Sequence, residues 1–184
     1  GFPEHGLEDY RRFVGDGVEE LARRVLPQGH RDEATVAKAL AVIRDEYRQR
    51  WINHTRPYDG IPELLDALTE RRLKIAILTN KPDDSTRAMV ARLLPDWRFD
   101  IILGATPALP RKPDPTGALQ VADSLGLPPR SFLYVGDSDI DMKTANAAGM
   151  YAVGVLWGFR SPDELIRNGA KALIGKPLEL LELL

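Results

Sequence analysis

From Ile61 to the C-terminus, short apolar runs alternate regularly with helical segments, and this pattern most constrains the fold. The apolar runs that we expect to be strands cover residues 73–78, 99–103, 131–135, 151–156 and 172–174. The helices that we expect beside them cover residues 62–71, 84–94, 116–125, 142–148 and 178–183. Near-continuous apolar strands separated by helices are typical of a parallel sheet covered on both faces. The sequence therefore predicts an α/β fold whose strands end at one edge, where such sheets bind ligands.

Residues 1–55 carry a different pattern, with no strand signal. Apolar residues recur at helical spacing over residues 7–14 and 18–26, and a longer helix is expected from Asp32, as its N-cap, to about residue 53. Residues 56–60 contain a proline and a glycine, which interrupt regular structure. We therefore predict a small all-helical module over residues 1–55, a linker over residues 56–60 and an α/β domain over residues 61–184.

Composition and charge argue against several classes of function. The chain has 184 residues, 43% of them hydrophobic and 28% charged, as in ordinary globular proteins. Its net charge of -2 argues against a nucleic-acid partner. The chain has no cysteine, so it can form no disulfide, no thiolate nucleophile and no zinc site with cysteine ligands. No apolar run approaches the roughly 20 residues that cross a bilayer, and residues 1–6 do not resemble a signal peptide. We expect a cytoplasmic protein with no membrane partner.

A cluster of aspartates, Asp137, Asp139 and Asp141, follows the expected strand over residues 131–135. Carboxylates this close repel one another unless a cation neutralises them, and oxygen ligands suit Mg²⁺ better than zinc. Aspartate also caps helix N-termini, but capping accounts for one acidic residue more readily than for three. We therefore predict that Asp137 binds a metal ion, with Asp141 as a second ligand or a holder of water. Asp139 can face solvent.

Polar residues suited to a phosphate follow two other expected strands. Thr79 and Asn80 follow residues 73–78, and a hydroxyl beside backbone N–H groups at such a turn can hold an anion, although Thr79 could equally be a helix N-cap. Lys112 lies in a segment stiffened by prolines and could neutralise phosphoryl charge, although taken alone it could equally be an exposed loop lysine. The prediction that Thr79, Asn80 and Lys112 bind phosphate rests on these loops occurring together. Residues 157–159 follow the expected strand over residues 151–156. They either border the expected phosphate site or only pack against the rest of the fold.

Taken in order, these motifs resemble the haloacid dehalogenase (HAD) superfamily of phosphohydrolases, over essentially the whole chain. The second, third and fourth motifs of that family are similar to residues 78–81 (LTNK), 111–115 (RKPDP) and 135–142 (VGDSDIDM). Residues 12–17 (RFVGDG) and 155–159 (VLWGF) are most similar to the phosphoglycolate phosphatase group. The resemblance implies a HAD-like Rossmannoid parallel sheet with helices on both faces, and a helical cap formed by residues 1–55.

The resemblance also implies roles for individual residues. Thr79 would hydrogen-bond the transferring phosphoryl group, Lys112 would balance charge around nucleophile and phosphate, and Asp137 would bind Mg²⁺ with help from Asp141. In the family, a first motif of the form Asp-x-Asp-x-Thr supplies a nucleophile, which forms an aspartyl-phosphate, and an acid–base group. No Asp-x-Asp precedes Asp137 here, and residues 137–139 lack the Gly-Thr that would follow in a first motif. We therefore expect an N-terminally truncated copy that is inactive alone.

The same omission has an expected structural effect. In the family, the first strand lies between the strands that end at Thr79 and Asp137. Without it, two inner sheet edges would keep unpaired backbone groups. We therefore expect the chain, as a monomer or homodimer, to be unstable alone or to be complemented by a strand from elsewhere.

The leading hypothesis is a Mg²⁺-dependent phosphomonoester hydrolase that acts on a small phosphorylated metabolite, with phosphoglycolate as the expected substrate. One alternative is a non-catalytic protein of the same fold that keeps the pocket for binding. Another is a phosphomutase or a dehalogenase of the same family. Dependence on Mg²⁺ would argue against a dehalogenase, and an isomerised sugar phosphate would indicate a mutase.

Overall fold

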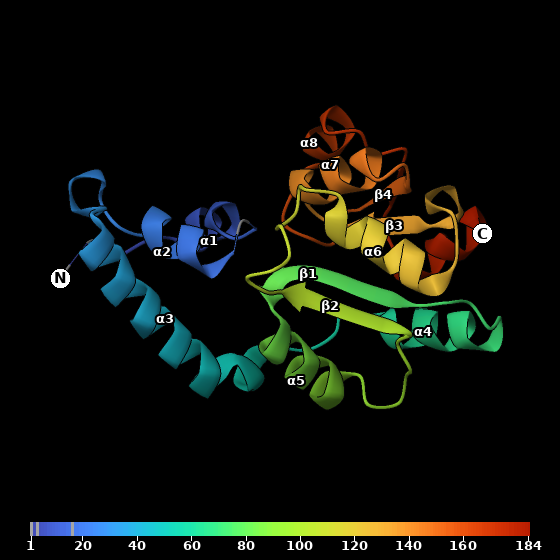
Figure 1. The fold of residues 1–184 in the computed structure, drawn as a ribbon, viewed down its shortest axis with the longest axis horizontal. Helices are drawn as coiled ribbons and strands as arrows, with labels where there is room; N and C mark the ends of the chain where they lie inside the picture. Colours follow the sequence, from blue (N-terminus) through green and yellow to red (C-terminus); the bar gives the residue numbers. More distant parts are fainter. Residues whose placement is uncertain (1, 3, 16) are drawn as a thin grey trace. The chain divides into compact units, whose positions relative to one another are not determined.

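The computed structural model describes residues 2, 4–15 and 17–184, which form two compact units, the described residues up to Arg56 and residues 57–184 (Figure 1). Asp16, in a segment that carries part of the family resemblance, lies outside the described residues. Each unit has a hydrophobic core of its own. The two are therefore described separately.

The described residues of the first unit form helices and no strand. They are α1 (Leu7–Phe13), α2 (Val18–Arg24), the 3-10 helix η1 (Gln28–His30) and α3 (Glu33–His54). Asp32 is the N-cap of α3 and accepts a hydrogen bond from the Thr35 N–H at 3.0 Å, which confirms the predicted start of this helix. Helices α2 and α3 pack together around a small core of Ala22, Leu26 and Val36.

The second unit alternates helices and strands, which confirms the predicted α/β class. Its elements are α4 (Ile61–Glu70), β1 (Ala76–Pro82), α5 (Asp83–Leu93), β2 (Ile101–Ala105), α6 (Thr116–Leu125), η2 (Pro129–Ser131), β3 (Leu133–Gly136), α7 (Asp139–Ala147), β4 (Tyr151–Val155), α8 (Pro162–Arg167), β5 (Ala172–Ile174) and η3 (Pro177–Leu183). Helix α8 was not predicted, and the predicted last helix is a 3-10 helix. Among the described helices, none is long and apolar enough to span a membrane.

Strand β1 differs from the expected strand in its position. The apolar run over residues 73–78 predicted a strand that ends before Thr79, whereas β1 continues to Pro82. Its pairing register with β2 shifts between Leu78 and Pro82. Thr79 and Asn80 therefore lie in an irregular last part of the strand, and the expectation that they lie in a loop beyond it is wrong. An irregular stretch of strand can redirect side chains toward a site, as β-bulges do.

The strands form two parallel sheets instead of one continuous sheet. Strand β1 pairs with β2, and β3 pairs with β4, which pairs with β5. In the part of the chain that the structure describes, β1 and β3 are each paired on one side and do not pair with each other. Helices α5 and α6 both pack on the two-stranded sheet, on opposite sides of it in Figure 1.

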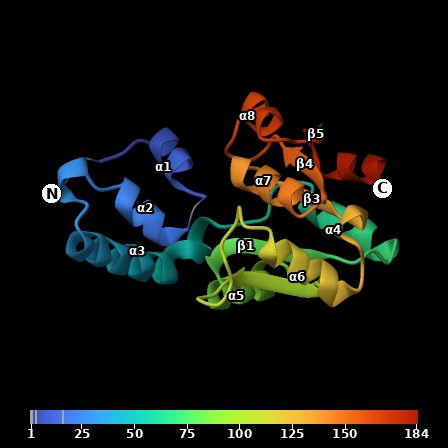
Figure 2. The ribbon, with the colours of Figure 1, turned by 45° about the horizontal axis from the view of Figure 1, so that its top comes forward.

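Helix α6 joins the two sheets through the core, and Figure 2 shows it alongside β1. A Cβ atom on Gly117 would lie 2.9 Å from Leu78 Cδ1, so this glycine permits the close approach of α6 to β1. On the other side, α6 contributes to a core cluster made with α7, β4 and α8. The buried members of this cluster are Ala118, Ala122, Met142, Ala145, Ala148, Met150, Ala152 and Leu165. Leu78 of β1 and Tyr134 of β3 both pack against this cluster, so one core holds the two strands although, among the described residues, no strand lies between them.

Candidate active site

Asp141 lies in the first turn of α7, where the start of the helix fixes its carboxylate. Ser138 is the N-cap of α7 and forms a capping box with Asp141. Asp141 Oδ2 accepts hydrogen bonds from the Ser138 hydroxyl at 2.6 Å and from the Ser138 N–H at 3.1 Å. Gly136 allows this packing, because a Cβ there would lie 2.2 Å from the Asp141 Cβ. The carboxylate is thereby held in one orientation, with Oδ1 directed away from the cap.

Lys112 meets the other oxygen of this carboxylate. Its Nζ lies 2.7 Å from Asp141 Oδ1 and 3.4 Å from the Leu78 carbonyl oxygen, and the two side chains of the pair are 13% and 9% exposed. Burial acts to lower the pKa of the Lys112 ammonium, but the attraction of and hydrogen bond to Asp141, together with Tyr134, outweigh it, and the pKa lies above its ordinary value. Lys112 is therefore a charged lysine at the junction of β1 and α7, and the possibility of an exposed loop lysine is excluded.

Asn80 is buried, and its side chain contacts the backbone of Lys112. Its Oδ1 accepts a hydrogen bond from the Lys112 N–H at 2.8 Å, and its Nδ2 donates one to the Lys112 carbonyl at 3.0 Å. Thr79, the residue before it, accepts a hydrogen bond at Oγ1 from the Lys81 N–H at 3.1 Å. That bond leaves the Thr79 hydroxyl proton available for a ligand. The structure thus brings Asn80 and Lys112 into contact, with Thr79 next to Asn80 in the chain, and their binding of phosphate stays a prediction.

Asp137 directly follows β3 and is held in place by the segment after β4. The Phe159 N–H donates a hydrogen bond to Asp137 Oδ2 at 3.0 Å. A Cβ on Gly158 would lie 2.1 Å from the Asp137 Cβ, so only glycine lets this segment approach so closely. Among the described residues, none donates a hydrogen bond to Asp137 Oδ1. Residues 157–159 thus lie against the predicted metal ligand, and one carboxylate oxygen stays available.

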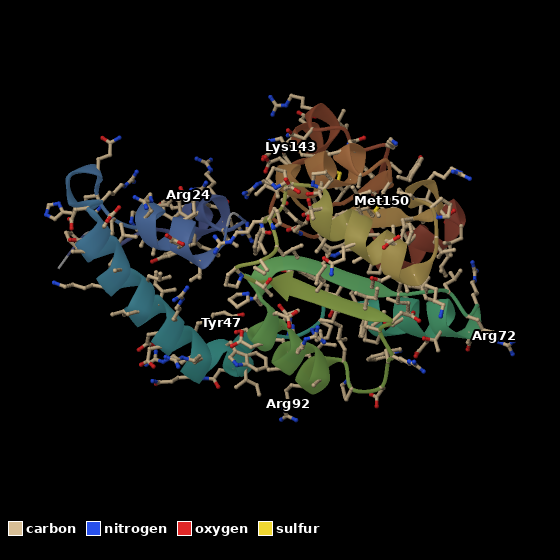
Figure 3. The ribbon with its side chains drawn as sticks, in the orientation of Figure 1. Arg24, Tyr47, Arg72, Arg92, Lys143 and Met150 are labelled. Atoms are coloured by element: carbon tan, nitrogen blue, oxygen red, sulfur yellow. The ribbon has the colours of Figure 1, made fainter. Side chains whose placement is uncertain are left out.

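The remaining aspartate of the cluster is neutralised by a lysine on its own helix. Lys143 Nζ lies 2.7 Å from Asp139 Oδ2; Figure 3 labels Lys143 on α7. Burial acts to raise the pKa of Asp139, but the hydrogen bond and charge of Lys143 lower it below its ordinary value. Lys112 and Lys143 each neutralise one of the three neighbouring carboxylates, so the repulsion between these carboxylates does not by itself require a metal ion.

Tyr134 of β3 is a further residue near this pair that the sequence reasoning missed. Its hydroxyl is buried, and within the described part of the chain it makes no hydrogen bond. Burial raises the pKa of this tyrosine to about 12, although Lys112 nearby acts to lower it. Lys112 Nζ lies 6.0 Å from the centroid of its ring, within the range of a cation–π contact. A polar residue in an otherwise apolar run was the signal that could have identified it.

The donor set is consistent with Mg²⁺ bound through few protein ligands. Asp137 offers a carboxylate oxygen, whereas both oxygens of Asp141 are already hydrogen-bonded. Within the described residues, no group of three or more acidic or histidine side chains is arranged to hold a metal ion. Mg²⁺ is commonly bound by one or two carboxylates together with waters and substrate phosphate oxygens. Asp137 fits that description, and Asp141 as a direct ligand stays a prediction.

Comparison with known proteins identifies the family. Residues 1–155 match the model of the haloacid dehalogenase-like hydrolase family. The chain is 30% identical to a phosphoglycolate phosphatase of Aquifex aeolicus, over 98% of this chain and 84% of that protein. It is 34% identical to a phosphoglycolate phosphatase of Pseudomonas putida, over 86% of this chain and 60% of that one.

Solved structures agree with this assignment. A provisionally assigned phosphoglycolate phosphatase from Lactobacillus delbrueckii superimposes with a TM-score of 0.90 at 28% identity, over 98% of this chain and 83% of that one. A haloacid dehalogenase-like hydrolase from Streptococcus pneumoniae shares the fold with a TM-score of 0.87 at 24% identity, over 98% and 82% of the two chains. The chain belongs to the haloacid dehalogenase-like hydrolase family and is phosphoglycolate phosphatase-like within it.

Proposed function

We propose that the protein acts as a Mg²⁺-dependent phosphomonoesterase on a small phosphorylated metabolite, phosphoglycolate first among them. The observation that carries this proposal is the charged Lys112 ammonium, buried beside Asp141 and beside the end of β1 that carries Thr79. A lysine held charged in a site with little water stabilises phosphoryl charge more strongly than one in bulk solvent. The names of the relatives from Aquifex aeolicus and Pseudomonas putida support phosphoglycolate as the substrate.

In this proposal, the residues of the chain divide the work of binding a phosphate ester. The Thr79 hydroxyl donates a hydrogen bond to a phosphoryl oxygen, while its own oxygen stays fixed by the Lys81 N–H. Lys112 lies beside the phosphoryl group and offsets the negative charge that collects there. Asp141 keeps this lysine in place and charged. Asn80, which we predicted to bind the phosphate, supports the site through Lys112.

Asp137 would hold Mg²⁺ through its available oxygen, and we propose that Asp141, four residues along the chain, is a second ligand or a holder of water. When bound, the metal supplies positive charge to the phosphate oxygens. The contribution of this chain is the fixed orientation of Asp137, which the Phe159 N–H and the close approach of Gly158 provide.

The nucleophile of the reaction is not assigned to a residue of this chain. No Asp-x-Asp precedes Asp137 in the sequence, and the chain covers between 60% and 84% of the curated relatives named above. We propose that the aspartyl-phosphate chemistry requires a family first strand with its Asp-x-Asp-x-Thr loop. The absence of that motif from these residues is the observation in favour of the alternative, a non-catalytic binding protein.

The decisive experiment measures phosphate release from phosphoglycolate, with and without Mg²⁺, for this chain and for a version extended by a family first strand and loop. We expect no turnover from the chain alone and Mg²⁺-dependent turnover from the extended version. Turnover by the chain alone would mean that one of its own carboxylates is the nucleophile. No turnover by either version, with phosphate still bound, would favour the binding protein, and formation of an isomerised sugar phosphate would favour a mutase.

A further inference from the structure

Asn80 makes an unusually complete contact with a single residue far away in the sequence. Its side-chain amide accepts from the Lys112 N–H at 2.8 Å and donates to the Lys112 carbonyl at 3.0 Å. This satisfies both backbone polar groups of Lys112, as a neighbouring strand would. Asn80 is 8% exposed, so water competes little for these bonds.

This contact affects the position of the Lys112 side chain. A lysine has several rotatable bonds, and fixing them all for one ion pair costs considerable entropy. Hydrogen bonds to the N–H and the carbonyl of Lys112, on either side of its Cα, fix the backbone from which the side chain extends. From that fixed origin, its Nζ reaches Asp141 Oδ1 at 2.7 Å and the Leu78 carbonyl at 3.4 Å.

The chemistry of the amide explains why asparagine suits this position. An aspartate would keep an acceptor for the Lys112 N–H but would place a second acceptor against the Lys112 carbonyl. An alanine would leave both backbone groups without their present partners in a buried place. A carboxamide of this length is therefore matched to both groups at once.

We propose that Asn80 is a positioning residue, which sets the place of the Lys112 ammonium through the Lys112 backbone and does not itself contact the phosphoryl group. Its consequence for catalysis rests on the function proposed above, whereas its effect on Lys112 can be measured without any turnover. The contact between Asn80, in the irregular end of β1, and Lys112, in the loop before α6, thus positions the Lys112 ammonium.

The test compares Asn80→Ala and Asn80→Asp with Asn146→Ala, all in the same protein. Asn146 is a matched control, because its amide also bridges two segments, donating to Met142 O at 2.7 Å and Gly169 O at 2.9 Å, outside the site. Amide hydrogen exchange at Lys112 reports the backbone contact, and acetic anhydride labelling of Lys112, relative to the other lysines, reports the position of its amine.

In Asn80→Ala, we expect amide exchange at Lys112 to rise about tenfold, the effect of losing one buried hydrogen bond, and relative labelling of Lys112 to rise several-fold. Asn80→Asp keeps one of the two bonds and should fall between Asn80→Ala and the unchanged protein. Asn146→Ala should leave both measurements at Lys112 unchanged. A general loss of stability would instead raise exchange and labelling at all lysines alike, and that outcome, or no change at Lys112, would overturn the proposal.

Kinetics separate positioning from direct phosphate binding in any version that turns over. A misplaced Lys112 should lower kcat about ten- to a hundredfold with little change in KM. A rise in KM alone would mean that Asn80 binds the substrate itself and would contradict the proposal. If no version turns over while Lys112 still responds to Asn80→Ala, the proposed function fails and the positioning role stands.

Discussion

Lys112 and Asp141 form an ion pair in which each residue depends on the other for charge compensation. Both side chains are largely removed from water, at 13% and 9% exposure, whereas the Lys143–Asp139 pair nearby is 50% and 23% exposed. Removal of one partner of a buried pair leaves an uncompensated charge, and this costs far more than removal of an exposed one. The two pairs, whose aspartates both lie on α7, therefore offer an internal comparison.

We predict that Lys112→Met destabilises the native polypeptide by about 3 kcal/mol, whereas Lys143→Met costs less than about 1 kcal/mol. Urea denaturation of both variants at neutral pH measures the difference. The double variant Lys112→Met/Asp141→Asn should recover part of the loss, because the unpaired carboxylate is gone. Equal destabilisation by the two lysine variants would contradict the assignment of Lys112 to a buried pair.

Gly158 is the residue whose side-chain size most directly controls Asp137. We predict that Gly158→Ala weakens Mg²⁺ binding about tenfold or more, because the added Cβ would displace the Asp137 carboxylate from the Phe159 N–H. Isothermal titration with Mg²⁺ measures the affinity directly. Gly29→Ala is the control, since a Cβ there would meet nothing within 4 Å. Unchanged Mg²⁺ affinity in Gly158→Ala would remove Asp137 as the ligand.

At the scale of elements, Asp83 joins the end of β1, the first turn of α5 and strand β2. Its carboxylate accepts hydrogen bonds from Arg87 Nε at 2.7 Å and from the Gly104 N–H at 2.9 Å. The bond to Arg87, followed by that to Gly104, holds the pKa of Asp83 below its ordinary value of 3.8. A carboxyl group whose folded pKa is lowered stabilises the fold fully above its unfolded pKa. That stabilisation is lost as the pH falls through the folded value.

We predict that Asp83→Asn lowers the free energy of unfolding by about 1–2 kcal/mol at pH 7, and that the difference from the unchanged protein shrinks as the pH falls below about 4. Thermal unfolding at a series of pH values measures this. Asp84→Asn, on the adjacent residue, is the control. A difference that stays constant down to the acid limit would show that the Asp83 charge is not what stabilises the junction.

The order and type of the elements could largely be predicted from the sequence, because apolar runs and helical periodicity report burial directly. Helix α6 begins and ends where predicted, and Asp32 caps α3 as expected. The end of β1 could not be predicted, because Thr79 and Asn80 are polar and continue the strand only through tertiary contacts. Helix α8 is too short for its periodicity to stand out.

The sequence could single out the candidate site residues, whose binding roles stay predictions, but it could not show the contacts between them. Three segments distant in sequence carried Thr79, Lys112 and Asp137, and the α/β pattern placed their strand ends together. No pattern could show that Asn80 bonds to the Lys112 backbone, because this contact joins positions 32 residues apart. The charge argument for Asp139 and Asp141 failed to count Lys143, four residues along α7, and Lys112, which reaches α7 from another loop.

At the scale of the whole molecule, the division of the second unit into two sheets affects the stability of the folded chain. Since β1 and β3 each pair on one side among the described residues, their other sides keep backbone groups that a further strand could satisfy. Such edges favour pairing with another chain. The expectation that the chain is complemented by a strand from elsewhere is therefore open to direct measurement.

We predict that this polypeptide by itself unfolds at low urea concentration or self-associates, because exposed sheet edges promote pairing between chains. Analytical ultracentrifugation combined with urea denaturation distinguishes these outcomes. A version extended by a family first strand should be monomeric and more stable. A stable monomer of the chain alone, with an ordinary midpoint, would contradict this prediction.

The contacts of Lys112 also affect how the second unit responds to mechanical force. Among the described residues, strands β1 and β3 share no ladder of hydrogen bonds, so a force that separates their sheets would act on helix α6 and on the Lys112–Asp141 pair. Side-chain contacts of this kind yield over short extensions, whereas a ladder must be sheared or unzipped bond by bond. The second unit should therefore be compliant along that direction, and an anion bound at Lys112 would act as a clamp that stiffens it.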